Sequence, residues 1–234
     1  MSSPQTLPHL PPATFFAGSR AALPIVLGYL PIGFAFGVLA QTAGLSVAEV
    51  GLMSLLVYAG SAQFIGVEML AAGAAYPAII STTFLVNLRH LLLSTALLPS
   101  FRQNPPAMNA LLSYGITDET FAVNASLLRG RPIGPQFVAG LHITSQGSWI
   151  LASIAGALAG GIATNQEALG LDFALAAMFI GLLVPNLRGE GAGKRQVAAA
   201  VAAVVAVAMG LMGQPSWGVI AATVVAATVG VMLR

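Results

Sequence analysis

The chain contains no cysteine, so it can form neither a disulfide bond nor a thiolate metal site. It is also poor in charge: Asp, Glu, Lys and Arg make up 7% of its 234 residues, whereas a soluble domain carries about 25%. The sequence patterns HExxH, the EF-hand loop and GxSxG are missing as well. These absences exclude an ordinary soluble domain and leave no motif for metal-dependent or serine-based catalysis.

Apolar residues dominate what is present. They account for 57% of the chain, and the mean hydropathy is +0.87. Four long stretches, 21–48, 50–67, 69–88 and 196–233, hold no charged residue. Because a membrane-spanning helix needs roughly 20 mostly apolar residues, the sequence predicts an all-α fold, a polytopic membrane helix bundle. We expect no cofactor and no nucleic-acid partner.

Turn residues divide the chain into about eight predicted spans, with seven as the lower count. The expected helices are 20–42, 47–73, 76–98, 108–128, 133–160, 168–187, 195–212 and 216–233. Residues 1–19 contain four prolines and neither Lys nor Arg, so we expect a disordered N-terminal tail instead of a cleavable signal. Residues 20–234 would then form a single transmembrane domain.

Basic residues predict the orientation, because Lys and Arg near span ends favour the cytoplasm. With eight spans and a cytoplasmic N-terminus, Arg102 alone among the basic residues outside the spans faces out. The cytoplasmic ones are Arg20, Arg129, Arg131, Arg188, Lys194, Arg195 and Arg234. This bias predicts that 108–128 crosses the membrane, whole or broken, and that both termini are cytoplasmic.

A weak internal repeat relates residues 20–98 to residues 108–187. Asn87-Leu88-Arg89 in the first half corresponds to Asn186-Leu187-Arg188 in the second. Three-helix units joined in series have opposite orientations, as in transporters built from inverted repeats with discontinuous helices. We therefore expect such a repeat, followed by two additional packing helices over 195–233.

Arg89 and His90 interrupt the apolar run 78–98. Ionisable groups at bilayer depth cost several kcal/mol and normally face a bundle interior, a partner or water. Arg89 therefore either pairs with a carboxylate and holds the bundle together, or binds a ligand directly. His90 is either a satisfied buried histidine or part of a proton relay. Asn87 lies on the same helical face as His90.

Asp118 and Glu119 are adjacent acids within a predicted span. Gly115 and Thr117 precede them and favour a local break, in which Thr117 caps a half-helix that starts at Asp118. Adjacent side chains on a helix point about 100° apart, so we expect different partners for the two acids. One would pair with Arg89, and the other would hold a proton or accept an ammonium group. In the alternative interpretation, both face a water-filled vestibule.

A second break is expected where Gly60 and Ser61 interrupt the apolar pattern, with Gln63 two residues further on. A discontinuous helix here would expose backbone N–H groups, which bind carboxylates well. The alternative is that these small residues serve close helix packing.

Four stretches, taken together, resemble one known family. They are LPIVLGYLPIGFAFGVLA at 23–40, LVYAGSAQFIG at 56–66, LVNLRHLLLS at 85–94 and TDETFAV at 117–123. In this order they are similar to the AzlC-type branched-chain amino acid permeases, over about residues 18–190. The resemblance implies a large subunit in the cell inner membrane. It also implies a small multi-span AzlD-type partner and export of valine, leucine, isoleucine or their analogues.

The residues singled out above suit that substrate class, because an amino acid needs an anion site, a cation site and, for these side chains, an apolar pocket. We expect the substrate-binding residues to be Gly60, Ser61, Gln63, Phe64, Asn87, Arg89, Phe36 and Phe121. We expect Asp118, Glu119 and His90 to couple export to protons in a secondary transporter with alternating access. The competing hypothesis is a non-transporting scaffold or assembly subunit whose buried charges lock it to a partner.

Overall fold

The computed structural model describes residues 12–128, 132, 134–160, 180, 183–184, 187–188, 192–213 and 215–233. Across these residues there is no strand, so the predicted all-α fold is confirmed. The helices are α1 (Phe15–Ala21), α2 (Leu23–Thr42), α3 (Val47–Leu56), α4 (Gly60–Ala71), α5 (Tyr76–Phe101), α6 (Pro106–Tyr114), α7 (Asp118–Leu128), α8 (Pro135–Gly160), α10 (Ala192–Leu211) and α11 (Pro215–Met232). Contacts divide the chain into two compact units, 1–176 and 177–234, and each is described by itself.

Two predicted spans are broken, which confirms the expected discontinuous helices. The span 47–73 consists of α3 and α4, and the span 108–128 consists of α6 and α7. The spans 76–98 and 133–160 are continuous and correspond to α5 and α8. Most of the predicted span 168–187 lies outside the described residues.

The expected tail 1–19 was too long, because α1 already begins at Phe15. Thr14 caps this helix by accepting a hydrogen bond from the N–H of Ala17 at 3.3 Å. Gly18 then lies so close to α8 that a Cβ atom would collide with the carbonyl of Phe137. Capping and close packing together order residues that composition alone suggests are loose. Residues 1–11 lie outside the described residues.

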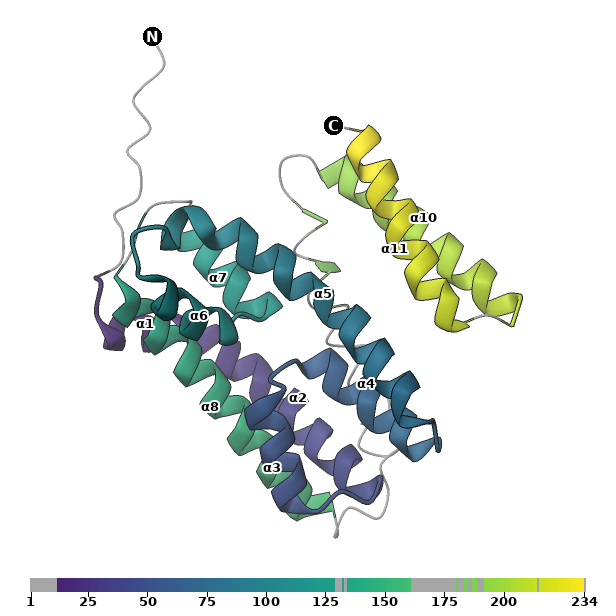
Figure 1. Ribbon diagram of the computed structural model, residues 1–234, viewed down its shortest axis with the longest axis horizontal. Helices are drawn as coiled ribbons and strands as arrows, with labels where there is room; N and C mark the ends of the chain where they lie inside the picture. The colour runs from purple at the N-terminus through teal and green to yellow at the C-terminus, as the bar shows by residue number, and fades with distance from the viewer. Residues whose placement is uncertain are drawn as a thin grey trace. The chain divides into compact units, whose positions relative to one another are not determined.

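The centre of the first unit is the close contact between α2 and α8, which lie side by side in Figure 1. Glycines bring the two backbones together. A Cβ on Gly37 would collide with the carbonyl of Ser153, and one on Gly156 with the carbonyl of Phe34. Small residues at a helix interface are the usual means of close packing in membrane bundles. This pair of helices therefore provides the frame against which the broken helices pack.

Aromatic side chains fill the space between this frame and α4. The ring of Trp149 on α8 lies 5.1 Å from that of Tyr29 and stacks 6.1 Å from that of Phe36. Phe64 of α4 meets Phe36 edge-on at 5.5 Å. Edge-to-face and offset contacts of this kind stabilise a core beyond simple burial. The start of α4 is thus held against the frame.

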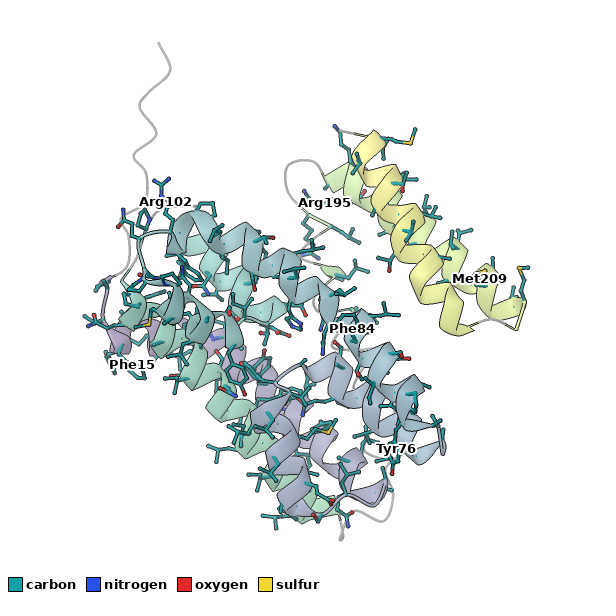
Figure 2. All side chains as sticks on the ribbon, viewed as in Figure 1. Phe15, Tyr76, Phe84, Arg102, Arg195 and Met209 are labelled. Carbon is teal, nitrogen blue, oxygen red and sulfur yellow. The ribbon has the colours of Figure 1, made fainter. Side chains whose placement is uncertain are left out.

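The long helix α5 packs against the two half-helices α4 and α7. Figure 2 follows it from Tyr76 past Phe84 to Arg102, at its C-terminal end. Phe84 and Leu91 are exposed, as expected of side chains that meet lipid. Among the described residues, α2, α5 and α10 are each long and apolar enough to cross a bilayer. A helical membrane bundle is confirmed, and eight crossings remain a prediction.

The second unit contains a helical hairpin formed by α10 and α11 (Figure 1). Gly213 has a positive φ of 74° in the turn between them, a conformation that glycine adopts without steric cost. No described residue of α10 is buried. The predicted helices 195–212 and 216–233 are confirmed as elements, while the single domain over 20–234 stays a prediction.

The inverted repeat also stays a prediction. The first half contains the half-helix α4, whereas the second half contains the continuous helix α8. Residues 161–179, which belong to the second half, lie outside the described residues.

Candidate functional site

The first break separates α3 from α4 at Val57, Tyr58 and Ala59. Tyr58 has φ +37°, the left-handed region that only glycine enters freely, so the backbone here is strained. The N-cap residue of α4, Ala59, makes no side-chain capping bond. At the end of α3, the carbonyl of Leu55 accepts hydrogen bonds from the Tyr114 hydroxyl and, at 3.1 Å, from the Gln146 amide. The carbonyl side of the break is thus satisfied, while the start of α4 has no side-chain cap.

The second break separates α6 from α7 at Gly115, Ile116 and Thr117. Thr117 and Thr120 cap α7 reciprocally, because each hydroxyl accepts the other residue's N–H, at 3.3 and 2.8 Å. The prediction that Thr117 caps a half-helix starting at Asp118 is confirmed.

Arg89 of α5 joins the two half-helices. One terminal nitrogen lies 2.9 Å from Asp118 Oδ2, and the other donates a hydrogen bond to the hydroxyl of Ser61. The two charged side chains are 27% and 26% exposed. The planar guanidinium suits this role, since its separate N–H groups reach two partners at once. The predicted pairing of Arg89 with a carboxylate is confirmed, and the partner is Asp118.

Glu119 has a different environment from its neighbour. The Tyr29 hydroxyl donates to Glu119 Oε2 at 2.8 Å and lies 2.8 Å from the hydroxyl oxygen of Thr117. Within the described residues, Glu119 forms no ion pair. The expectation that the two adjacent acids have different partners is therefore confirmed.

His90 and Asn87 lie one turn or less from Arg89, but their contacts are local. His90 Nδ1 is 3.2 Å from the carbonyl of Asn87 on the same helix. Asn87 Oδ1 is buried and has no hydrogen-bond partner within the described residues. In the described part of the chain no hydrogen bond joins His90 to either acid, so its coupling role stays a prediction.

The other expected substrate residues lie in the packed core. Gln63 donates to Ser54 Oγ at 3.2 Å and accepts from the Trp149 indole at 2.9 Å, so both ends of its amide are bonded. Phe36 and Phe64 are 0% and 1% exposed. Their place in a substrate pocket stays a prediction, and in this conformation they pack against each other.

Gly60 and Phe121 have different surroundings. Gly60 faces Trp149, since a Cβ there would come within 3.0 Å of the indole ring. Phe121 is half-buried beside the separate core cluster that includes Leu97 and Ile116. Of the predicted residues, the structure thus brings Ser61, Arg89 and Asp118 into direct contact, with Glu119 following in the same helical turn.

Several residues of this region were not predicted as site residues: Tyr29, Tyr58, Asn124 and His142. The signal that points to them is a buried polar group within an apolar span, since Tyr and His side chains need a partner there. Asn124 Nδ2 lies 3.1 Å from His142 Nε2, and a Cβ on Gly115 would collide with the His142 ring. No cluster of metal-ligating side chains occurs among the described residues.

Comparison with known proteins identifies the family. The model of the AzlC protein family matches residues 24–163, which include both helix breaks and α5. The chain belongs to the AzlC family. A second model, that of the MJ1155 family, matches residues 168–234, the part that contains the α10–α11 hairpin of this AzlC-family chain. No solved structure matches the chain.

Relatives of this AzlC-family chain are membrane proteins from bacteria and archaea. An uncharacterised membrane protein of Archaeoglobus fulgidus is 37% identical over 213 residues, which cover 90% of this chain and 91% of the relative. The inner membrane protein YgaZ of Escherichia coli is 34% identical over 80% of this chain and 79% of its own length. The branched-chain amino acid transport protein AzlC of Bacillus subtilis is 26% identical over 76% and 70%. A membrane location follows for this chain.

Proposed function

We propose that this AzlC-family chain is a secondary transporter subunit that exports branched-chain amino acids through the cell inner membrane, coupled to protons. The relative from Bacillus subtilis is named for branched-chain amino acid transport. The observation that carries the proposal is the convergence of two broken helices on Arg89. Broken helices are typical of the sites at which secondary transporters bind a small charged substrate and its coupling ion.

The substrate carboxylate belongs at the start of α4 in this proposal. Ala59 leaves this helix without a side-chain cap, so the first N–H groups are available as donors, and Arg89 supplies positive charge beside them. Because Arg89 already holds Asp118, a substrate carboxylate would share or replace that partner. Asp118 and Glu119, in the first turn of α7, supply negative charge for the ammonium group and for protons.

The aromatic core beside the site suits a branched apolar side chain. Phe36, Phe64 and Trp149 form continuous apolar surface next to Gly60. These rings are packed together in this conformation, so admitting a side chain requires that α4 move relative to α2 and α8. Alternating access provides such a movement, with the glycine-packed pair of α2 and α8 as the fixed frame.

The proposal also includes a small multi-span partner and a cytoplasmic location of both termini. The orientation is supported by the concentration of basic residues on one predicted side. The partner is the small AzlD-type subunit that the family resemblance implies.

Efflux from intact cells tests the function. Cells without a valine exporter of their own, expressing this chain together with the small subunit, are loaded with labelled valine. The proposal predicts faster valine loss than from cells that carry an empty vector, and loss of that gain in the doubly substituted Asp118→Asn, Glu119→Gln protein. Efflux equal to that of the empty-vector cells contradicts the function; efflux unaffected by the double substitution contradicts the site.

The Arg89→Ala variant distinguishes the transporter from a non-transporting scaffold. Arg89 forms its ion pair within this chain, so the charge is satisfied without a partner. We therefore expect the Arg89→Ala protein to remain in complex with the small subunit on affinity capture and to lose efflux. A scaffold whose charges lock it to its partner would instead lose the complex together with all activity.

A further inference from the structure

A second polar cluster surrounds the acid that directly follows Asp118 in the first turn of α7. It comprises the carboxylate of Glu119 and the hydroxyls of Tyr29, Thr117 and Tyr58. Tyr29 bonds both Thr117 and Glu119 at 2.8 Å. The Tyr58 ring meets that of Tyr29 edge-on at 6.5 Å, which places Tyr58 beside the same group of hydroxyls. The cluster therefore draws on α2, on α7 and on the break between α3 and α4.

Two polar groups of this cluster lack a partner that their chemistry calls for. The Tyr58 residue is 3% exposed, yet its hydroxyl has no hydrogen-bond partner among the residues that the structure describes. The carboxylate of Glu119 has no cation beside it within the described residues, while Asp118 has Arg89. A buried hydroxyl without a partner and an unpaired carboxylate are each costly in a medium of low dielectric. Both deficits are met by a group that carries positive charge and donates several hydrogen bonds.

A primary ammonium group has these properties. It donates three hydrogen bonds, which can be shared between the carboxylate of Glu119 and hydroxyl oxygens such as that of Tyr58. The aromatic rings of Tyr29, Tyr58 and Trp149 stand edge to face around the same corner. Aromatic rings beside a carboxylate attract cations further through their quadrupoles.

We propose that the corner formed by Glu119, Tyr29, Tyr58 and Thr117 is the subsite for the substrate ammonium group, and that a proton on Glu119 competes with that ammonium. This rests on the proposed function and specifies its coupling. When Glu119 is protonated, it is neutral and holds no ammonium. When an ammonium binds, the proton of the Glu119 carboxyl has left to solvent. The Glu119 carboxylate binds either the substrate ammonium or a proton, but never both at once. Export of an amino acid is thereby exchanged for import of a proton.

Other titratable groups surround this corner and must be separated from Glu119. Asp118 is engaged by Arg89, His90 bonds the carbonyl of its own helix, and His142 bonds Asn124. The neighbouring titratable and charged groups are Tyr29, Tyr58, Arg89, His90, Tyr114, Asp118 and His142. A variant that neutralises Glu119 alone therefore identifies which group carries the proton.

The test compares valine with 2-hydroxy-3-methylbutanoate, which has the same carboxylate and side chain but no ammonium. Binding to the full chain, purified in detergent together with its small subunit, is measured over roughly pH 4 to 8, which spans the ordinary ranges in which carboxylates and histidines change charge. Wherever Glu119 carries a proton in the ligand-free complex, we expect valine affinity to fall by up to about tenfold for each pH unit towards acid, with one proton released on binding. Binding of the hydroxy acid is expected to be weak and independent of Glu119.

Two variants with matched controls sharpen the result. Glu119→Gln should weaken valine binding and make it independent of pH, whereas Glu68→Gln, on the exposed surface of α4, should not. Tyr58→Phe should weaken valine binding about tenfold, the loss of a hydrogen bond to a charged group, without lowering the stability of the ligand-free protein. The control for it is Tyr76→Phe, whose side chain is exposed.

The outcomes separate this inference from the proposed function. Valine that binds with the same affinity at every pH, or whose pH dependence survives Glu119→Gln, overturns the inference and leaves the function standing. Equal binding of valine and the hydroxy acid overturns it too. If the unsubstituted complex binds no valine, the proposed function fails and the inference fails with it.

Discussion

Arg89 and Asp118 lie 2.9 Å apart, and through this contact the middle of α5 is joined to the first turn of α7. The same guanidinium reaches Ser61 in the first turn of α4. One side chain therefore spans the starts of two half-helices that are separated by more than fifty residues in sequence. Any movement of α4 against α7 must alter this contact.

Arg89→Lys tests the need for two contacts at once. Lysine keeps the charge, but its single nitrogen replaces the two separate nitrogens that here reach Asp118 and Ser61, so we expect at least one of the two contacts to be weakened. We expect a loss of about 1–2 kcal/mol in the free energy of unfolding, measured by thermal denaturation in detergent, together with slower valine efflux. Wild-type efflux and stability in Arg89→Lys would contradict the bridging role.

Gly37→Ala tests the close packing of α2 on α8. The added Cβ collides with the carbonyl of Ser153, and backbone yields less easily than a side chain, so we expect a destabilisation of about 2 kcal/mol. Gly28→Ala is the control on the same helix, because nothing lies within 4 Å of its Cβ position. This control should be neutral or slightly stabilising, since alanine favours helix. Equal midpoints for both variants would refute this packing.

Gly115→Ala tests the contact between the second break and α8. Gly115 has φ −84°, which alanine adopts without strain, so the cost comes from the collision with the His142 side chain, of which His142→Ala removes the ring but not the Cβ. In a double-mutant cycle with His142→Ala, we expect part of that cost to disappear, with a coupling of about 1–2 kcal/mol. If the two stability losses measured by thermal denaturation are additive, His142 does not contact the break between α6 and α7.

Much of this site was predictable from sequence because its signals are local. Charged residues within apolar runs identified Arg89, Asp118 and Glu119, and the pattern Gly115 to Thr117 indicated a capped break. Which of the two acids pairs with Arg89 was not predictable. Helical geometry shows that Asp118 and Glu119 point apart, but only the packing of α5 against α7 shows which one meets Arg89.

The predictions that failed or stayed open depend on long-range packing. Phe15 to Ser19 were expected in a loose tail, because proline content is local, whereas the burial of Gly18 against α8 is not. Tyr58 was overlooked since nothing in the sequence predicts a positive φ for a tyrosine. The signals that were available were the hydroxyl groups of Tyr29 and Tyr58 within apolar segments.

The orientation of the chain can be tested with single cysteines, because the chain has none of its own. Gln103, after α5, and Gly193, at the start of α10, are both exposed. We expect Gln103→Cys to react with a membrane-impermeant maleimide on intact cells from the periplasmic side once the outer membrane is opened. Gly193→Cys should react only after the inner membrane is opened. The reverse pattern would place both termini outside.

The most direct test of the account is valine efflux from proteoliposomes that contain the chain with its small subunit, measured with and without a pH gradient. An acidic exterior should accelerate the loss of labelled valine from wild-type vesicles, and the gradient should have no effect on vesicles that carry Glu119→Gln. Loss of valine from wild-type vesicles at the rate of protein-free vesicles, under every gradient, would contradict it.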